Sequence, residues 1–225
     1  MSLKCSIIKM KLFFQQISIG IIMATRDATE VFSEWALRNR DEGMESGHAN
    51  SVNEMLNIVI PMLIEPFSAI DVGCGNGWVC RKLQSNDSCG KVVGIDGSIE
   101  MIIKAKQNGG DFYLAKLPDW NPPQKFDLIH SMEFLYYLKD PLEMLKIFFN
   151  EWLNYKGVLI AGVDHYLENT ESHDWPRSLN VHMTTLSEEQ WKQGMIDAGF
   201  TDVETRRVGI KSGFIGTLAI FGRKD

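Results

Sequence analysis

The sequence predicts an α/β fold in which helices cover both faces of a mostly parallel, seven-stranded sheet. Short β-branched runs alternate with helical patterns between residues 67 and 198, and the last two runs have no room for a helix between them. Two amphipathic segments precede the first run. With 225 residues, of which 44% are hydrophobic, the chain has the size of one ordinary domain.

The N-terminal part of this domain is expected to form a helical cap. Apolar residues recur at three- and four-residue intervals over 27–40 and 48–64, which is the spacing of one helix face. We therefore predict a single domain over residues 24–225, made of a cap over 24–65 and a core over 66–225.

Residues 1–23 precede this domain and contain a broken apolar stretch that is too short to span a bilayer. We interpret them as a disordered or loosely packed extension. A secretory signal is the alternative, but no clear small-residue cleavage site follows.

The core shows the alternation that is typical of βαβ units, whose parallel strands are buried on both faces. The predicted strands cover 67–72, 91–96, 111–115, 126–131 and 157–163, and the predicted helices cover 76–84, 98–107, 140–153 and 187–198. The runs 201–208 and 214–223 are separated only by a turn region that holds Gly209 and Gly213. Two strands joined so tightly are antiparallel, so the sheet is expected to end in a hairpin.

Composition excludes several kinds of partner. The 29 acidic residues outnumber the 23 basic ones, and no dense Lys/Arg run is present, so no nucleic-acid partner is expected. The four cysteines lack CxxC spacing, which argues against a disulfide framework and a structural zinc. We predict no metal site, no membrane partner and a cytoplasmic location.

A glycine-rich loop follows the first predicted strand. In AIDVGCGNG the strand ends at Asp71, and Gly73, Gly75 and Gly77 then come at alternate positions before a helix. Each glycine lacks a Cβ, so the backbone can turn sharply and approach a ligand closely. The helix N-terminus then presents free N–H groups to a carboxylate. A purely structural strand-to-helix turn is the alternative.

Asp96 ends the second predicted strand, KVVGID. A carboxylate at that strand end can accept both hydroxyl hydrogens of a ribose. A role as helix N-cap is the alternative. The third glycine of the loop lies one place earlier than in the dinucleotide fingerprint, which disfavours an NAD site.

The pattern D-x-G-x-G-x-G resembles motif I of class I S-adenosylmethionine-dependent methyltransferases, and GIDGSIEMIIKA resembles their second-strand segment. The resemblance implies a Rossmann-like methyltransferase sandwich with S-adenosylmethionine as cofactor and S-adenosylhomocysteine as product. Many relatives carry an acidic residue after the third strand, but here Ala115 and Lys116 occupy that region, so backbone near Lys116 and Leu117 is expected to contact adenine. Met101 is placed against the adenine face, with ordinary helix packing as the alternative. The cofactor-binding residues that follow are Asp71, Gly73, Cys74, Gly75, Asp96, Gly97, Met101, Lys116, Leu117, Ser131 and Met132.

The fourth predicted strand matches the family segment that lies beside the transferring methyl group. Its continuation LIHSMEFLYYLKD is locally similar to histamine N-methyltransferases, which are small-molecule enzymes. We predict Glu133, His165 and Tyr137 as catalytic residues, because a carboxylate or imidazole can neutralise an amine nucleophile. Glu133 as a helix cap and His165 as an ordinary loop residue are the alternatives.

Residues 163–185 show no helix or strand periodicity and follow a predicted strand end, so we expect them to form an acceptor lid. The segment DEGMESGHANSV is unusual for a helix–helix linker, since Gly43 and Gly47 bracket a short charged piece. The predicted substrate-binding residues are Trp35, Met44, His48, Tyr136, Tyr166 and Trp175.

The leading hypothesis is methyl transfer to N, O or C of a small-molecule acceptor by a monomer or homodimer. A non-catalytic S-adenosylmethionine-binding regulatory module is one alternative, and intact cofactor residues beside a closed acceptor pocket would favour it. An NAD-dependent oxidoreductase is the other.

Overall fold

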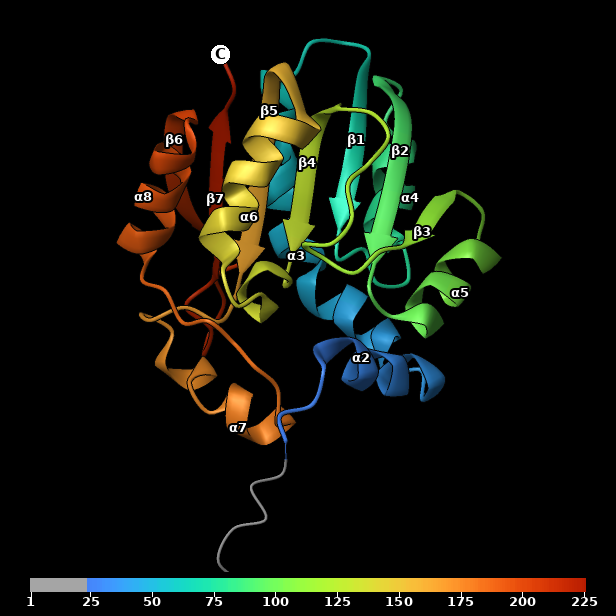
Figure 1. The fold of residues 1–225 in the computed structure, drawn as a ribbon, viewed down its shortest axis with the longest axis vertical. Coiled ribbons are helices and arrows are strands. Elements are labelled where there is room, and N and C mark those ends of the chain that lie inside the picture. The colour runs from blue at the N-terminus through green and yellow to red at the C-terminus, as the bar shows by residue number, and fades with distance from the viewer. Residues whose placement is uncertain (1–23) are drawn as a thin grey trace, which may run out of the picture.

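The computed structural model describes residues 24–225, so the predicted extension 1–23 lies outside the described residues. One seven-stranded sheet runs through the molecule in the order β3-β2-β1-β4-β5-β7-β6 (Figure 1). Strands β1 to β5 are parallel, and β7 pairs antiparallel with both β5 and β6. The predicted fold class, including the final hairpin, is confirmed. The strands are β1 (Phe67–Val72), β2 (Cys89–Asp96), β3 (Asp111–Leu114), β4 (Phe126–Met132), β5 (Leu153–Val163), β6 (Thr201–Val208) and β7 (Thr217–Arg223).

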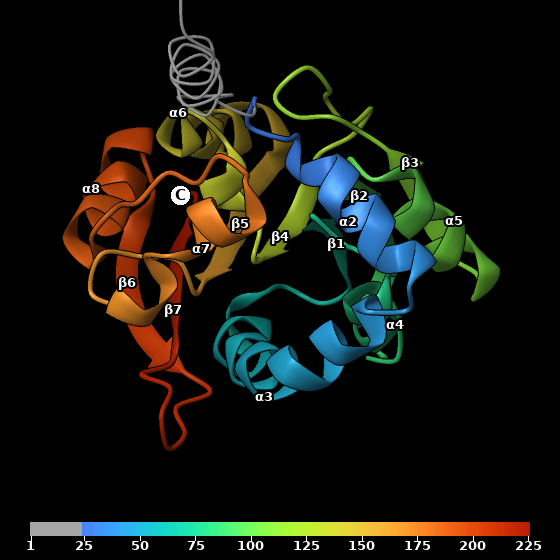
Figure 2. The same cartoon turned by 90° about the horizontal axis from the view of Figure 1, so that it is seen from below.

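Helices cover both faces of the sheet. Seen along the sheet from below, α3 and α4 lie on one side and α6 and α8 on the other, while α2 crosses beneath the carboxyl ends of β1 and β2 (Figure 2). The helices are α2 (Ala28–Leu37), α3 (Asp41–Val59), α4 (Trp78–Gln84), α5 (Ile99–Gln107), α6 (Pro141–Ile147), α7 (Trp175–Leu179) and α8 (Glu188–Ala198), with short turns η1 (Ile60–Met62), η2 (Leu135–Tyr137), η3 (Phe148–Trp152) and η4 (Thr170–Ser172). No helix among residues 24–225 is long and apolar enough to cross a membrane.

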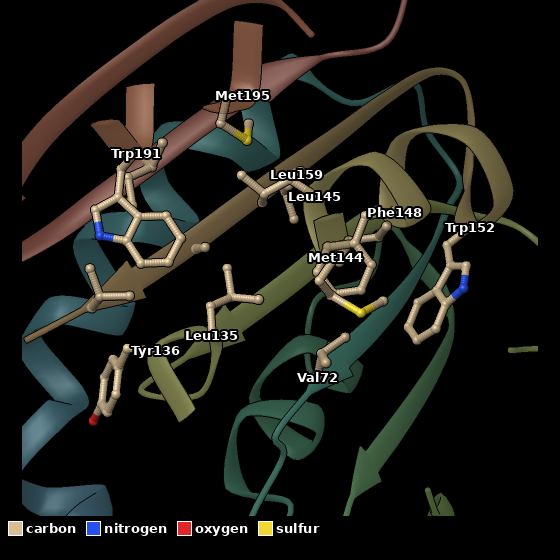
Figure 3. Close-up of a cluster of buried hydrophobic side chains, with 14 of the residues drawn as sticks. Val72, Leu135, Tyr136, Met144, Leu145, Phe148, Trp152, Leu159, Trp191 and Met195 are labelled. Atoms are coloured by element: carbon tan, nitrogen blue, oxygen red, sulfur yellow. The ribbon is translucent and has the colours of Figure 1, made fainter. Parts of the chain in front are cut away.

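The two faces of the sheet form two separate hydrophobic clusters. Alternate residues of β1 divide between them, because successive side chains of a strand point to opposite faces. Ile70 and Val72 join the cluster beneath α6 and α8, whereas Phe67 and Ala69 join the cluster beneath α3 and α4. Figure 3 shows the first cluster, in which residues from α6, α8 and the sheet interdigitate. This burial fixes the position of the strand ends from which the site is built.

Several helices begin at the polar residues that helix N-termini require. Asp27, Ser98 and Asp140 each accept a hydrogen bond from a backbone N–H in the first turn of α2, α5 and α6. Ser187 forms a reciprocal capping box with Gln190 at the start of α8. These caps satisfy N–H groups that have no partner inside the helix.

The prediction differs from the structure most clearly in three segments. The second cap helix begins at Asp41 instead of residue 48, so the supposed linker is helical. The helix predicted over 140–153 ends at Ile147, continues as a π-helical turn, and gives way to β5 at Leu153. Residues 163–185 contain the short helical turns η4 and α7, although no helix periodicity predicts them.

Candidate cofactor and acceptor site

The candidate site lies at the carboxyl ends of the parallel strands. There β1 has β2 on one side and β4 on the other, which is the position where open α/β sheets bind ligands. A cavity of about 1130 Å³ opens between this edge, α2 and the 163–185 segment. A smaller cavity of about 50 Å³ adjoins it next to α3. Of the predicted site residues, those that line the larger cavity are Met44, Gly73, Gly75, Asp96, Gly97, Met101, Lys116, Leu117, Met132, Glu133 and Tyr137.

The glycine loop has the conformation that its sequence suggests. Gly73, Gly75 and Gly77 all have positive φ angles, between 52° and 81°, which side chains with a Cβ rarely adopt. A Cβ on Gly73 would lie 2.6 Å from the Cβ of Phe134. A Cβ on Gly75 would approach only Met101, at 4.0 Å. The loop therefore presents open backbone to the cavity at Gly75.

Asp96 joins the loop to the second strand. One carboxylate oxygen accepts the N–H of Gly75 at 2.9 Å, and the other accepts the N–H of Ser98 at 2.7 Å. Ser98, not Asp96, is the N-cap of α5. Burial raises the pKa of Asp96 to about 6. Each oxygen keeps a second acceptor position, so the carboxylate can still receive two ligand hydroxyls.

The residues of the expected adenine site follow the carboxyl ends of β2 and β3 in the chain. Met101 is buried, yet it lines both cavities and belongs to neither core cluster. Lys116 forms an ion pair with Asp27, the cap of α2, and Leu117 follows it along the cavity wall. A Cβ on Gly97 would lie 2.5 Å from the side chain of Thr29, so α2 packs closely over this turn.

The remaining predicted cofactor residues differ in position. Asp71 is buried, accepts a hydrogen bond from Nδ1 of His130 at 2.7 Å, and lines the smaller cavity together with Cys74. Burial raises the pKa of the Cys74 thiol well above its ordinary value, so the thiol is not a ready nucleophile. Ser131 lies in the sheet, where its hydroxyl donates to the carbonyl of Val72, and it lines neither cavity.

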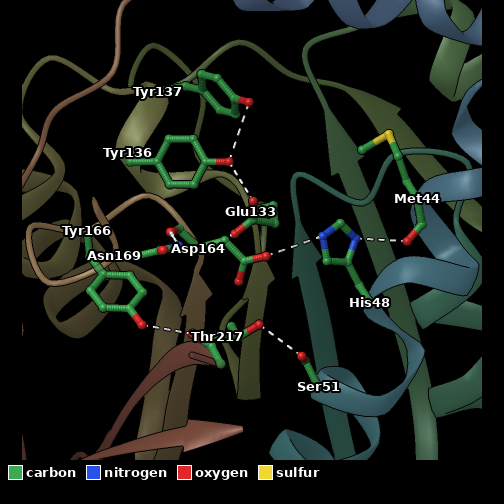
Figure 4. Close-up of polar contacts among 11 residues, drawn as sticks. Met44, His48, Ser51, Glu133, Tyr136, Tyr137, Asp164, Tyr166, Asn169 and Thr217 are labelled. Atoms are coloured by element: carbon green, nitrogen blue, oxygen red, sulfur yellow. Dashed lines mark hydrogen bonds and ion pairs between the residues drawn. The ribbon is translucent and has the colours of Figure 1, made fainter. Parts of the chain in front are cut away.

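Glu133 lies just after β4 and lines both cavities. Figure 4 shows its polar contacts. Its φ of 56° is unusual for a residue with a side chain. Its carboxylate accepts the backbone N–H of Asp164 at 2.5 Å and the hydroxyl of Tyr136 at 2.7 Å. Burial, together with the nearby charge of Asp164, raises the pKa of Glu133 to about 8. Glu133 does not cap the following turn.

The two tyrosines of η2 have different surroundings. Tyr136 is buried in the core, and its hydroxyl reaches only Glu133 and the hydroxyl of Tyr137. Tyr137 lines the larger cavity and packs edge-on against Phe32 of α2, with ring centroids 5.3 Å apart. One tyrosine therefore supports Glu133, and the other faces the cavity.

His48 and Met44 of α3 close the inner end of the site (Figure 4). Nδ1 of His48 lies 2.8 Å from the carbonyl oxygen of Met44, and Nε2 lies 3.6 Å from Oδ2 of Asp164. Among residues 24–225, His48, Glu133 and Asp164 place ligand-capable atoms within 4.8 Å of one another. The site thus combines the carboxylates of Glu133 and Asp164 and the imidazole of His48 with the ring of Tyr137, which lines the larger cavity.

Besides Ser131 and Tyr136, four further predicted residues lie outside both cavities. His165 is fully buried, with Nδ1 at 3.1 Å from the carbonyl of Ser172 and Nε2 at 2.8 Å from the hydroxyl of Thr185, so it ties the two ends of the 163–185 segment together. Tyr166 donates to the carbonyl of Gly216. Trp175 packs over His165, and Trp35 packs edge-on against Phe32.

The sequence analysis missed Asp164. It follows β5 directly, as Asp96 ends β2, so a carboxylate at a parallel strand end was the available signal. Asp164 is buried, and its Oδ1 has no hydrogen-bond partner among the described residues.

Comparison with known proteins identifies the class of this domain. The model of a family described as a methyltransferase domain matches residues 26–205. The chain belongs to this family of S-adenosylmethionine-dependent methyltransferases, and the match rules out the NAD-dependent alternative.

Trans-aconitate 2-methyltransferase of Escherichia coli K12 is 31% identical over 132 residues, which cover 57% of this chain and 47% of that protein. The chain thus spans about half the length of the curated relatives it matches.

Two solved structures show the same fold. The methyltransferase in a complex with the Trm112 activator of Haloferax volcanii has a TM-score of 0.77 and 26% identity, and the match covers 88% of this chain and 98% of that one. A Thermotoga maritima protein described as a possible histamine N-methyltransferase has a TM-score of 0.64 and 20% identity, covering 87% and 99%. The second likeness bears on the fold alone.

Proposed function

We propose that the chain catalyses methyl transfer from S-adenosylmethionine to a small-molecule acceptor. The observation that carries this proposal is the continuity of the larger cavity, which runs from the glycine loop and Asp96 to Glu133 and Tyr137. Its volume of about 1130 Å³ leaves room for an acceptor next to the cofactor. A non-catalytic module with a closed acceptor pocket is therefore disfavoured.

The residues present fit the cofactor. Gly75 leaves open space where a Cβ would stand, and Asp96 keeps free acceptor positions on a carboxylate that lines the cavity. Bound S-adenosylmethionine supplies a methyl group on a sulfonium, which needs no further activation. Gly73, Gly75 and Asp96 would hold this group, with Gly97, Met101, Lys116 and Leu117 around its adenine end.

The contribution of this chain is then mainly positioning. An in-line displacement gains most when the nucleophile is held close to the methyl carbon. Glu133 has a fixed orientation because both its oxygens are hydrogen-bonded, and Tyr137 lines the same cavity where it packs against Phe32 of α2. We propose that the acceptor lies between these two side chains, while α2 and residues 181–183 of the lid, which line the cavity, exclude water.

The proposal is tested by calorimetry and by a transfer assay. Purified protein is titrated with S-adenosylmethionine and, as a control, with NAD; binding of the first and none of the second is expected. A small-molecule library that includes trans-aconitate and histamine is then screened for methyl transfer. The Haloferax relative was solved with a Trm112 activator, so the screen is run with and without a Trm112 protein. Absence of S-adenosylmethionine binding would refute the proposal.

A further inference from the structure

The inner end of the site carries more negative charge than its surroundings balance. Glu133 and Asp164 are adjacent carboxylates, and a ring nitrogen of His48 lies within 4.8 Å of a carboxylate oxygen of each. Asp164 is 5% exposed, and its Oδ1 is buried without a hydrogen-bond partner. Buried carboxylates without a cation are costly, so this cluster is suited to a ligand that brings positive charge.

The orientation of His48 decides which of its nitrogens can take a proton. The carbonyl of Met44 can only accept a hydrogen bond, so Nδ1 of His48, at 2.8 Å, must carry its hydrogen. Neutral His48 therefore has its lone pair on Nε2, which points toward Asp164 (Figure 4). The 3.6 Å between Nε2 and Oδ2 is too long for a hydrogen bond but short enough for an ion pair once Nε2 is protonated.

The charges around His48 favour its protonated form. Burial alone would lower the pKa of His48, but its contact with Asp164 and the charges of Glu133 and Asp164 outweigh this effect and raise the pKa. Glu133 responds in the complementary way, since burial and Asp164 favour its neutral form. Without a ligand, protons thus supply the positive charge that the cluster lacks.

The rest of the cavity offers little to an anionic acceptor. Arg26 and Lys116, which line it, are already paired with Glu34 and Asp27. Lys139 is exposed and lies next to Asp140 in the chain. The aromatic rings of Tyr137 and Phe32 also line the cavity, and aromatic faces attract cations.

Resting on the proposed methyl transfer, we infer that the acceptor is a primary or secondary amine that binds as its ammonium ion against Glu133. The charge of the ammonium ion replaces the charge that His48 holds without a ligand, so His48 releases its proton and Nε2 then accepts one from the bound ammonium ion. Asp164 acts as a positioning residue that stabilises the resulting imidazolium. The freed nitrogen lone pair then forms the N–C bond to the methyl carbon, and the C–S bond breaks with its electron pair going to sulfur. The product nitrogen takes over the positive charge of the sulfonium, and the proton on His48 leaves to solvent.

The charge of the cluster favours an amine such as histamine over a carboxylate such as trans-aconitate, the acceptors named for two of the similar proteins. A carboxylate such as trans-aconitate would add negative charge beside Glu133 and Asp164. An amine would replace the protons that the empty cluster holds. We therefore expect amine binding at neutral pH to release about one proton, most of it from Glu133, because the ammonium ion favours the ionised carboxylate.

The experiment uses the full chain saturated with S-adenosylhomocysteine, and calorimetry with phenethylammonium, hydrocinnamate and trans-aconitate as probes. The first two have a similar ring and chain but opposite charge. Phenethylammonium is expected to bind, with proton release measured in buffers of different ionisation enthalpy, and neither carboxylate is expected to bind. Glu133→Gln should weaken phenethylammonium binding at least about tenfold and abolish the proton release. Glu151→Gln, on an exposed residue that lines neither cavity, should change neither.

The inference is overturned if a carboxylate probe binds more tightly than phenethylammonium, if phenethylammonium does not bind, or if Glu133→Gln leaves its binding and proton release unchanged. Binding of Zn²⁺ to chelator-treated protein that needs His48 and excludes phenethylammonium would also overturn it, and would assign the cluster to a metal. Should Glu133→Gln not fold, the comparison of probes on the unmodified chain still decides. Loss of S-adenosylhomocysteine binding would instead count against the proposed function itself.

Discussion

Replacing Glu133 with Gln should make the protein more stable at alkaline pH. Burial raises the pKa of Glu133 from 4.5 to about 8, so between these values the folded protein holds a proton that the unfolded chain has released. The unfolded state then binds fewer protons, and the free energy of unfolding falls as the pH rises through this window. A glutamine at this position cannot ionise, and it has the size and shape of the protonated carboxyl group.

The size of the effect follows from the same pKa change. At about 1.4 kcal/mol for each tenfold change in proton affinity, the upper limit is about 5 kcal/mol. Solvent reaches Glu133 through the cavity and screens its charge, which reduces the cost of ionisation. We expect Glu133→Gln to be about 2 kcal/mol more stable than the unmodified protein at pH 8 and nearly equal to it below pH 4.5.

Urea unfolding at a series of pH values measures this difference directly. Glu143→Gln is the matched control, because Glu143 is an exposed glutamate whose side chain retains 56% of its accessible surface. It should follow the unmodified protein at every pH. If Glu133→Gln also runs parallel to the unmodified protein, Glu133 is ionised in the folded state at neutral pH and our account of the cluster is wrong.

Three further predictions concern the cofactor and acceptor halves of the cavity. Asp96→Ala should weaken S-adenosylmethionine binding by about 1 to 3 kcal/mol in calorimetry, with exposed Asp111→Ala as control; equal affinities would remove the ribose assignment. Gly73→Ala should weaken that binding at least tenfold, because φ is 76° and the new Cβ would lie 2.6 Å from Phe134; unchanged affinity would show that the loop relaxes. Tyr137→Phe should raise KM for the acceptor without changing S-adenosylmethionine affinity, and the reverse pattern would place Tyr137 on the cofactor side.

The cofactor half of the site could be predicted because its signal is local. A buried strand, three alternate glycines and a later strand that ends in Asp96 are contiguous features, and each one constrains the backbone around it. The positive φ angles at Gly73 and Gly75 and the hydrogen bond from Gly75 to Asp96 agree with that pattern. The backbone conformation of such a loop is set by the order of residues along the chain, so the sequence alone is enough to predict it.

The start of α3 shows why local signals failed elsewhere. Gly43 and Gly47 have poor helix propensity, and the apolar periodicity predicts a helix only from residue 48. The structure instead extends the helix to Asp41, whose buried carboxylate pairs with Lys104 at 2.6 Å and accepts from Asn76 at 3.0 Å. These partners come from elements far along the chain, and they hold the first turn in place against the weak propensity of two glycines.

On the acceptor side, the sequence prediction chose His165, whereas the structure places the neighbouring residue, Asp164, beside His48. We predicted His165 as a catalytic residue, together with Glu133 and Tyr137, because imidazole chemistry suits proton transfer at neutral pH. Side chains alternate along a strand, however, and Ala161 and Val163 already point into the cluster beneath α6 and α8. His165 continues that set and is buried in the 163–185 segment, whereas Asp164 points the other way, toward His48 of α3. Residue chemistry alone favoured His165, but the alternation of side chains along the strand turns Asp164 toward His48 instead.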